Sequence, residues 1–154
     1  CKVLKEDAGL AADIIGDILC HSTLDPDELE RERGVILQEI GQANDTPDDI
    51  VFDHFQDAAF PDQPMGRPTL GTTAIIEGMR RESLTGYMRR HYGPSRMVVA
   101  AAGAIEHEAL LAMTRAHFAD LPAVSPEAPA PASYVGGEFR EERELDQVHL
   151  VLGF

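Results

Sequence analysis

The sequence predicts an α+β fold for this 154-residue chain, and three observations support that prediction. Apolar residues recur at helical spacing through most of residues 8–118. A continuous apolar run at residues 97–102 lies between turn residues, as is typical of a buried strand. Two segments near the C-terminus, residues 138–145 and 149–154, also resemble strands. Helices and strands in this order indicate one α+β body, followed by the start of a second sheet.

The first three predicted helices are separated by breaks that contain proline. Residues 8–20 repeat large apolar side chains at helical spacing, which predicts the first helix. The next two helices are expected to begin where a capping residue precedes a proline, at Asp25-Pro26 and at Thr46-Pro47. They run to about residue 42 and to residue 60.

The middle of the chain alternates between loops and shorter periodic segments. Residues 62–72 are rich in proline and glycine and predict a loop, and residues 73–79 predict a short helix. Clearer amphipathic helices are expected over residues 82–92 and 106–118, on either side of the predicted strand at 97–102.

Residues 122–133 differ in composition from everything before them. Their four prolines alternate with small and polar residues, so no core can be built from this stretch. We therefore divide the chain into a first domain at residues 1–121, a linker at 122–133, and the first strands of a second domain at 134–154.

Composition excludes several classes of function. The formal charge of −14 argues against a nucleic-acid partner, which requires a basic surface. No apolar run approaches the roughly 20 residues that span a bilayer. The two cysteines, Cys1 and Cys20, cannot form a disulfide framework or a cysteine-rich zinc site. Cys20 is expected to be a buried free thiol, which favours a reducing compartment, and we expect the protein in the cytoplasm.

The second predicted helix holds two glutamates on its apolar side. With Leu29 at zero and about 100° per residue, Glu32 falls at about 300° and Glu39 at about 280°. Both positions lie inside the apolar sector that runs from Val35 round to Leu37. Two turns separate the glutamates, so their carboxylates lie about 10 Å apart along one face. Buried carboxylates are costly unless a cation, a metal or a hydrogen-bond donor satisfies them.

A second interpretation of this helix is equally simple. Runs of glutamate and arginine usually form a solvated face with weak ion pairs between residues three and four apart. Arg33 also falls inside the apolar sector, at about 40°, so the separation of polar and apolar sides is imperfect. Periodicity alone leaves both interpretations open.

The chain contains no complete catalytic or metal-binding constellation of its own. It has no Gly-x-Ser-x-Gly nucleophile elbow and no phosphate-binding loop. Its six histidines lie far apart, and none forms a pair at helical spacing. His54 follows Asp53 among aromatic residues, where a hydrogen-bonded core or rim histidine is more common than a metal ligand.

Four segments occur in order along the chain and read LERERGVILQEI (29–40), DDIVFDHF (48–55), PMGRPTLG (64–71) and YMRRHYGPSRMVVAAAG (87–103). Together with the break at residues 118–122, they resemble the M16 family of zinc metallopeptidases, which includes pitrilysin and the mitochondrial processing peptidase. The resemblance is to bacterial relatives of the processing-peptidase β subunit.

The resemblance implies a zinc peptidase and assigns the two glutamates. In that family, zinc is held by the two histidines of a His-x-x-Glu-His motif and by a distant glutamate, and the glutamate of the motif activates the zinc-bound water. Glu39 matches the distant zinc ligand. Glu32 matches a second glutamate that supports activity through contacts with the ligands or the water. The implied fold is the later part of one αβ half, with helices packed on one face of an antiparallel sheet.

The chain departs from the family in one large respect, because it contains no His-x-x-Glu-His motif. We expect a fragment whose first residue falls after that motif in the family order. Alone, it should be inactive and should bind zinc weakly or not at all. Missing strands would leave a sheet edge exposed, which predicts self-association.

Two functional hypotheses follow from the resemblance. In the first, the parent protein is a zinc endopeptidase that hydrolyses peptides, unfolded proteins or presequence-like segments, together with the other M16 half or subunit. In the second, the parent is a non-catalytic subunit of the same fold that acts in binding or assembly, like the processing-peptidase α subunit or the core proteins of the bc1 complex. Two carboxylates retained on an apolar helix face favour the first hypothesis.

Overall fold

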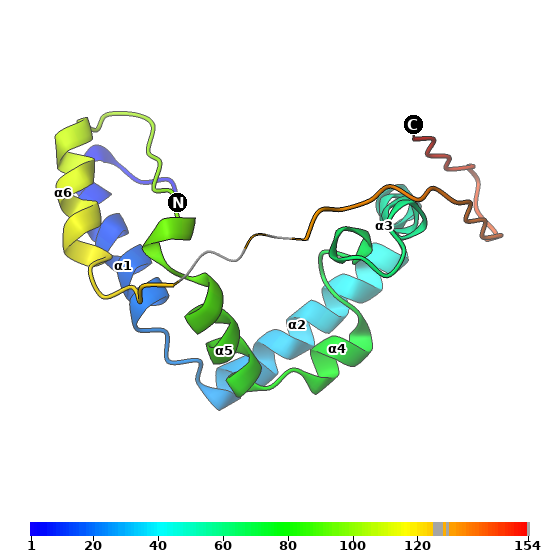
Figure 1. Cartoon of the computed structure of the whole chain (residues 1–154), viewed down its shortest axis with the longest axis horizontal. Helices are drawn as coiled ribbons and strands as arrows, with labels where there is room; N and C mark the ends of the chain where they lie inside the picture. The colour runs from blue at the N-terminus through cyan, green and yellow to red at the C-terminus, as the bar shows by residue number, and fades with distance from the viewer. Residues whose placement is uncertain (125–127, 129, 154) are drawn as a thin grey trace. The chain divides into compact units, whose positions relative to one another are not determined.

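The computed structural model describes residues 1–124, 128 and 130–153, and these residues form two compact units. Unit 1 comprises Cys1–Asp25 and Arg80–Ala128, and unit 2 comprises Pro26–Met79 and Pro129–Phe154. Each unit is therefore built from two separate stretches of the chain (Figure 1).

Unit 1 is built on a pair of packed helices, α1 and α6. It contains the 3-10 turns η1 (Lys5–Asp7) and η3 (Pro94–Arg96) and the helices α1 (Ala8–Cys20), α5 (Arg81–His91) and α6 (His107–His117). The helix α1 lies along α6 (Figure 1). Gly16 packs against the end of α6, where an added Cβ would lie 2.5 Å from the carbonyl oxygen of His117. Only glycine therefore permits this approach.

Unit 2 is built around the longest helix, α2. It contains α2 (Pro26–Asn44), α3 (Pro47–Ala59), the 3-10 turn η2 (Pro64–Gly66) and α4 (Thr73–Gly78). Helix α2 contacts both α3 and α4, and Ile40 and Ala59 are buried there. Part of the extended C-terminal segment follows α3, where the Val135 N–H donates to the carbonyl of Ala59 at 2.9 Å.

All six α-helices of the described residues were predicted, with ends that shift by one or two residues. The predicted proline starts of α2 and α3 are confirmed. Thr46 does not cap α3 with its side chain, because its hydroxyl donates to the carbonyl of Gln42 at 2.7 Å. At α4, Thr72 does cap, and its hydroxyl accepts from the Ile75 N–H at 3.3 Å.

The α+β fold class is wrong for the structure, which has no strand or sheet among the described residues. Residues 97–102 lack strand structure and are mostly exposed, with Val98 92% accessible. Residues 138–145 and 149–153 are likewise without a strand partner, and Phe154 lies outside the described residues. A helix closes its hydrogen bonds within its own segment, whereas a strand exists only when another strand accepts and donates to it. The apolar runs have the composition of strands, but no other segment among the described residues pairs with these runs.

Two dependent predictions are affected. Self-association through a sheet edge has no basis in the described residues, since they contain no sheet. The linker predicted at 122–133 includes residues 125–127 and 129, which lie outside the described residues, and the domain division stays a prediction. None of the described helices is long and apolar enough to cross a membrane.

Candidate functional site

The candidate site is the exposed side of α2. Of the four glutamates of this helix, two are paired with arginines and two have no partner among the described residues. The helix begins at Pro26 with Asp27 and Glu28 in its first turn, where acidic side chains suit the positive end of the helix dipole. Its inward side is formed by Ile36, Leu37 and Ile40, of which Ile40 is buried.

Two of the glutamates are held in ion pairs with arginines three residues later. Arg31 pairs with Glu28, and both side chains are exposed. Arg33 pairs with Glu30 at 3.1 Å, and its own side chain is only 19% exposed. Pairs at this spacing are the ordinary stabilising contacts of a charged helix face.

The other two glutamates, Glu32 and Glu39, are exposed and have no hydrogen bond or ion pair with any described residue. The sequence explains why, because no cation lies three or four residues from either one. Those neighbours are Glu28, Leu29, Val35 and Ile36 for Glu32, and Val35, Ile36, Gln42 and Ala43 for Glu39. The two carboxylates are therefore free to accept from, or to bind, a group from outside.

Of the two interpretations left open for α2, the burial of these carboxylates is the one that the structure contradicts. The side of α2 that is withdrawn from solvent is centred on Ile36 and Ile40, and Val35 beside the glutamates is 47% exposed. The apolar sector drawn from the sequence was thus too wide on this flank, and the solvated-face interpretation describes the structure. Their roles as zinc ligand and as supporting carboxylate stay predictions.

A catalytic zinc ion needs three protein ligands and one open position. In the part of the chain that the structure describes, no group of three His, Cys, Asp or Glu side chains is placed to hold a metal ion. Glu39 has the right chemistry for one oxygen ligand, and nothing in the described residues competes for it. The described residues therefore fit a zinc centre as donors of one ligand and not as a complete site.

His54 and Cys20 make contacts of their own, each within its unit. His54 on α3 stacks on Phe139 with ring centroids 4.0 Å apart, and its Nε2 lies 3.6 Å from an oxygen of Glu141. This Nε2 is buried without a hydrogen-bond partner, so His54 is a rim residue, as expected, but not a hydrogen-bonded one. Cys20 is free, as predicted, but half-buried, with Sγ 3.7 Å from the carbonyl oxygen of His117. Burial, followed by the charges of Asp120 and Asp17, raises the pKa of this thiol, which disfavours a nucleophilic role.

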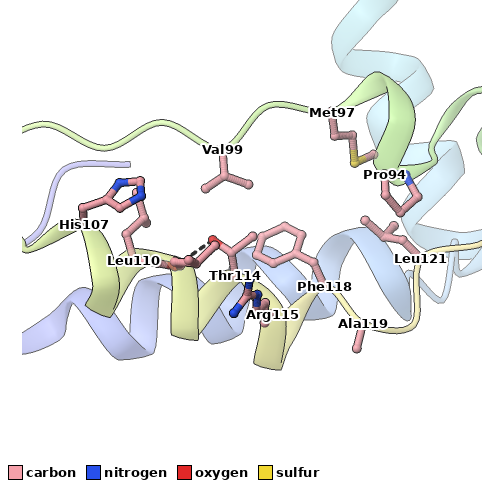
Figure 2. A pocket seen from close by; sticks show the side chains of 11 residues that line it. Pro94, Met97, Val99, His107, Leu110, Thr114, Arg115, Phe118, Ala119 and Leu121 are labelled. Atoms are coloured by element: carbon pink, nitrogen blue, oxygen red, sulfur yellow. Dashed lines mark hydrogen bonds between the residues drawn. The ribbon is translucent and has the colours of Figure 1, made fainter.

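Unit 1 has an apolar groove of about 470 Å³ between α6 and the extended segment that precedes it (Figure 2). Val99, Leu110, Phe118 and Leu121 are among its lining residues, and Thr114 donates to the carbonyl of Leu110 at 2.8 Å. No carboxylate lines the groove. It therefore lacks a carboxylate ligand for a metal ion, and its polar lining residues are His107, Thr114 and Arg115.

Sequence reasoning missed one residue of the site, Arg33. Its position inside the apolar arc was visible, but its partners were not. They are the carbonyl oxygens of Ile76, Glu77 and Met79 at the end of α4, more than forty residues away.

Comparison with known proteins identifies the class of protein. Residues 1–73 match the profile described as "Insulinase (Peptidase family M16)", and residues 78–154 match "Peptidase M16 inactive domain". Both descriptions name peptidase family M16. The chain belongs to the M16 family of zinc metallopeptidases, and that predicted resemblance is confirmed.

Similar proteins cover nearly the whole chain. It is 36% identical over 99% of its length to an "Uncharacterized zinc protease" of Rickettsia bellii, covering 37% of that protein. It is 37% identical over 98% of its length to the "Mitochondrial-processing peptidase subunit beta" of Saccharomyces cerevisiae, covering 34% of that protein. The chain thus spans about a third of the length of these relatives.

A solved structure shares the fold. A chain of "Complex III2 from Candida albicans, Inz-5 bound" superposes with a TM-score of 0.73 and 22% identity, covering 88% of this chain and 33% of that one. At this identity, the likeness shows the fold alone.

Proposed function

We propose that the whole protein is a zinc-dependent endopeptidase in which Glu39 donates one zinc ligand and Glu32 supports it. The observation that carries the proposal is the pair of unpaired carboxylates on the exposed side of α2. Two relatives named as a zinc protease and a processing peptidase support the reaction class. The remaining ligands would come from a His-x-x-Glu-His motif outside these 154 residues.

In this proposal the zinc ion activates the water, and this chain supplies one ligand and one supporting carboxylate. A zinc ion bound by three ligands lowers the pKa of its water towards neutrality, which supplies a nucleophile for peptide hydrolysis. Glu39 contributes an anionic oxygen to the coordination. Glu32, two turns earlier, accepts hydrogen bonds from the neighbouring ligands or water and so holds them in orientation. The substrate would be a peptide or an unfolded, presequence-like segment, and the site would be completed by the other M16 half or subunit, in the cytoplasm.

The 154-residue chain alone is then inactive, since one carboxylate does not hold zinc tightly. Removing zinc from the whole protein should abolish hydrolysis, and adding zinc to the 154-residue chain should not create it.

The deciding experiment measures zinc content and peptidase activity of the full-length protein and of its Glu39→Gln and Glu32→Gln variants. Glu39→Gln should lose both zinc and activity. Glu32→Gln should weaken zinc binding by roughly 10–100-fold, as the loss of a contact to a metal ligand does. Glu28→Gln is the matched control, because it removes the same charge from the same helix and should change neither quantity. Full zinc content and activity in Glu39→Gln would refute the assignment.

A second candidate is a non-catalytic M16-fold subunit that acts in binding or assembly. The description "Peptidase M16 inactive domain" over residues 78–154 favours it. It predicts a full-length protein that contains no zinc even before any substitution, so the same zinc measurement separates the two candidates.

A further inference from the structure

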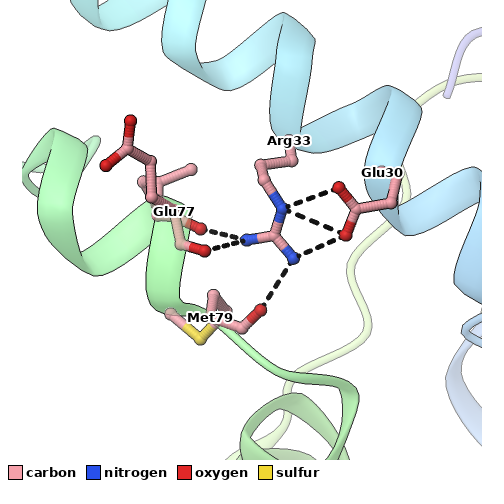
Figure 3. Close-up of polar contacts among 5 residues, drawn as sticks. Glu30, Arg33, Glu77 and Met79 are labelled. Carbon is pink, nitrogen blue, oxygen red and sulfur yellow. Dashed lines mark hydrogen bonds and ion pairs between the residues drawn. The ribbon is translucent and has the colours of Figure 1, made fainter.

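Arg33 joins α2 to the end of α4 through its whole guanidinium group (Figure 3). Its Nε and its terminal nitrogen Nη2 both donate to the carboxylate of Glu30, and the distance from Nη2 to Oε1 is 3.1 Å. The same terminal nitrogen donates to the carbonyl oxygen of Met79 at 2.8 Å. The other terminal nitrogen donates to the carbonyl oxygens of Ile76 and Glu77. A guanidinium has five N–H donors, and these acceptors occupy all of them.

The acceptors are carbonyl groups in the last turn of α4 and just after it, and the carbonyl of Ile76 also accepts from the Met79 N–H at 3.2 Å. Ile76 and Glu77 lie in its last turn, and Met79 follows its end. The last carbonyls of a helix carry partial negative charge, so a partly buried cation at this point is favourable. We call this contact the Arg33 clamp, consisting of Arg33, Glu30 and the three carbonyls.

Apolar packing alone holds α2 only lightly. Ile40 is the one residue of this helix that is buried, and Ile36 and Leu37 are half-buried. Among the described residues, few apolar side chains therefore fix the rotation of α2 about its own axis. The clamp is directional, since planar guanidinium hydrogen bonds have a fixed geometry.

The clamp and the two free carboxylates lie on different sides of the same helix. Arg33 is at about 40° on the helical wheel, and Glu32 and Glu39 are about 100–120° away from it. Fixing Arg33 against α4 therefore fixes the direction in which both glutamates point.

We propose that Arg33 is a positioning residue, which sets the rotation of α2 and thereby aims Glu32 and Glu39 at the metal centre. This inference rests on the proposed function, because it gives the clamp a role only if Glu39 binds zinc. It assigns no chemical step to Arg33, which contacts neither carboxylate in the described structure.

The test uses the full-length protein and compares zinc dissociation, kcat, KM and thermal unfolding across four variants. Arg33→Gln should raise the zinc dissociation constant by roughly tenfold, the scale seen when support of a metal ligand is lost. It should lower kcat more than it raises KM. Arg33→Lys should recover part of the loss, because an ammonium group reaches some of the carbonyls but cannot donate as a fork.

Two controls separate positioning from general loss of stability. Arg31→Gln removes an arginine from the same helix, where the pair with Glu28 is exposed, and should change none of the four quantities. Ala59→Gly loosens the buried end of α3 and should lower the unfolding temperature without changing zinc dissociation.

Each outcome decides between the two proposals. If Arg33→Gln alters zinc dissociation no more than Ala59→Gly does, Arg33 is merely structural and the inference is refuted, while Glu39→Gln still reports on the proposed function. If Glu39→Gln retains zinc, the proposed function fails and the inference fails with it. If Arg33→Gln and Glu39→Gln both weaken zinc binding and Arg31→Gln does not, both proposals stand.

Discussion

Replacing Gly16 by alanine tests the tight contact between α1 and the end of α6. The new Cβ would lie 2.5 Å from the carbonyl oxygen of His117 and 2.8 Å from its Cβ, and the nearer of these atoms is backbone, which cannot swing away. Overpacking of this kind costs about 1–3 kcal/mol, and the short distance to backbone places it at the upper end. Alanine recovers about 1 kcal/mol of helix propensity. The net expectation is a loss of about 2 kcal/mol from unit 1.

Gly9→Ala is the matched control in the same helix, because an added Cβ there meets nothing within 4 Å. It should stabilise α1 by about 0.5 kcal/mol. Thermal unfolding followed by circular dichroism measures both variants, and at about 4 °C per kcal/mol the Gly16 variant should unfold roughly 8 °C lower. A Gly16→Ala protein as stable as the Gly9→Ala protein would show that α1 and α6 do not approach this closely.

Two further predictions concern single titratable groups. The hydrogen bond from Arg143, with smaller contributions from the charges of Arg143 and His54, holds the pKa of Glu141 below its ordinary value of 4.5. A lowered folded-state pKa stabilises the protein above the ordinary value, and this contribution disappears as the pH falls through the lowered one. Arg143→Gln should therefore raise the pKa of Glu141 in an NMR titration, and an unchanged titration would contradict the contact. Because burial raises the pKa of Cys20, iodoacetamide at pH 8 should modify the exposed Cys1 several times faster, and equal rates would contradict this.

The sequence predicted the helices because their signals are local. Apolar spacing, a capping residue before proline, and glycine or proline after the last turn all act within a few residues of the element that they define. This is why α1, α2 and α3 begin where the sequence placed them. The strand prediction used equally local signals for an element that is not local, and it was wrong for the described residues.

The candidate site shows the same division. Glu32 and Glu39 were found because a family pattern and a helical repeat coincide on them, and the absence of cations three or four residues away was already written in the sequence. The exposure of these two glutamates could not be predicted, because a helical wheel shows which residues share a face but not how much of the helix surface its neighbours cover. That coverage depends on which side chains α3 and α4 bring to α2.

By itself, then, the sequence determined the helices, the family, and the two glutamates of α2. The tertiary structure decided that these carboxylates face solvent and that the apolar runs form no strands in the described residues. It also decided that Arg33 donates all five of its N–H groups to Glu30 and to carbonyls at the end of α4. The physical reason is range. Helical hydrogen bonds and i to i+4 contacts close within a few residues, whereas burial, strand pairing and the acceptors of a guanidinium depend on segments that meet only when the chain has folded.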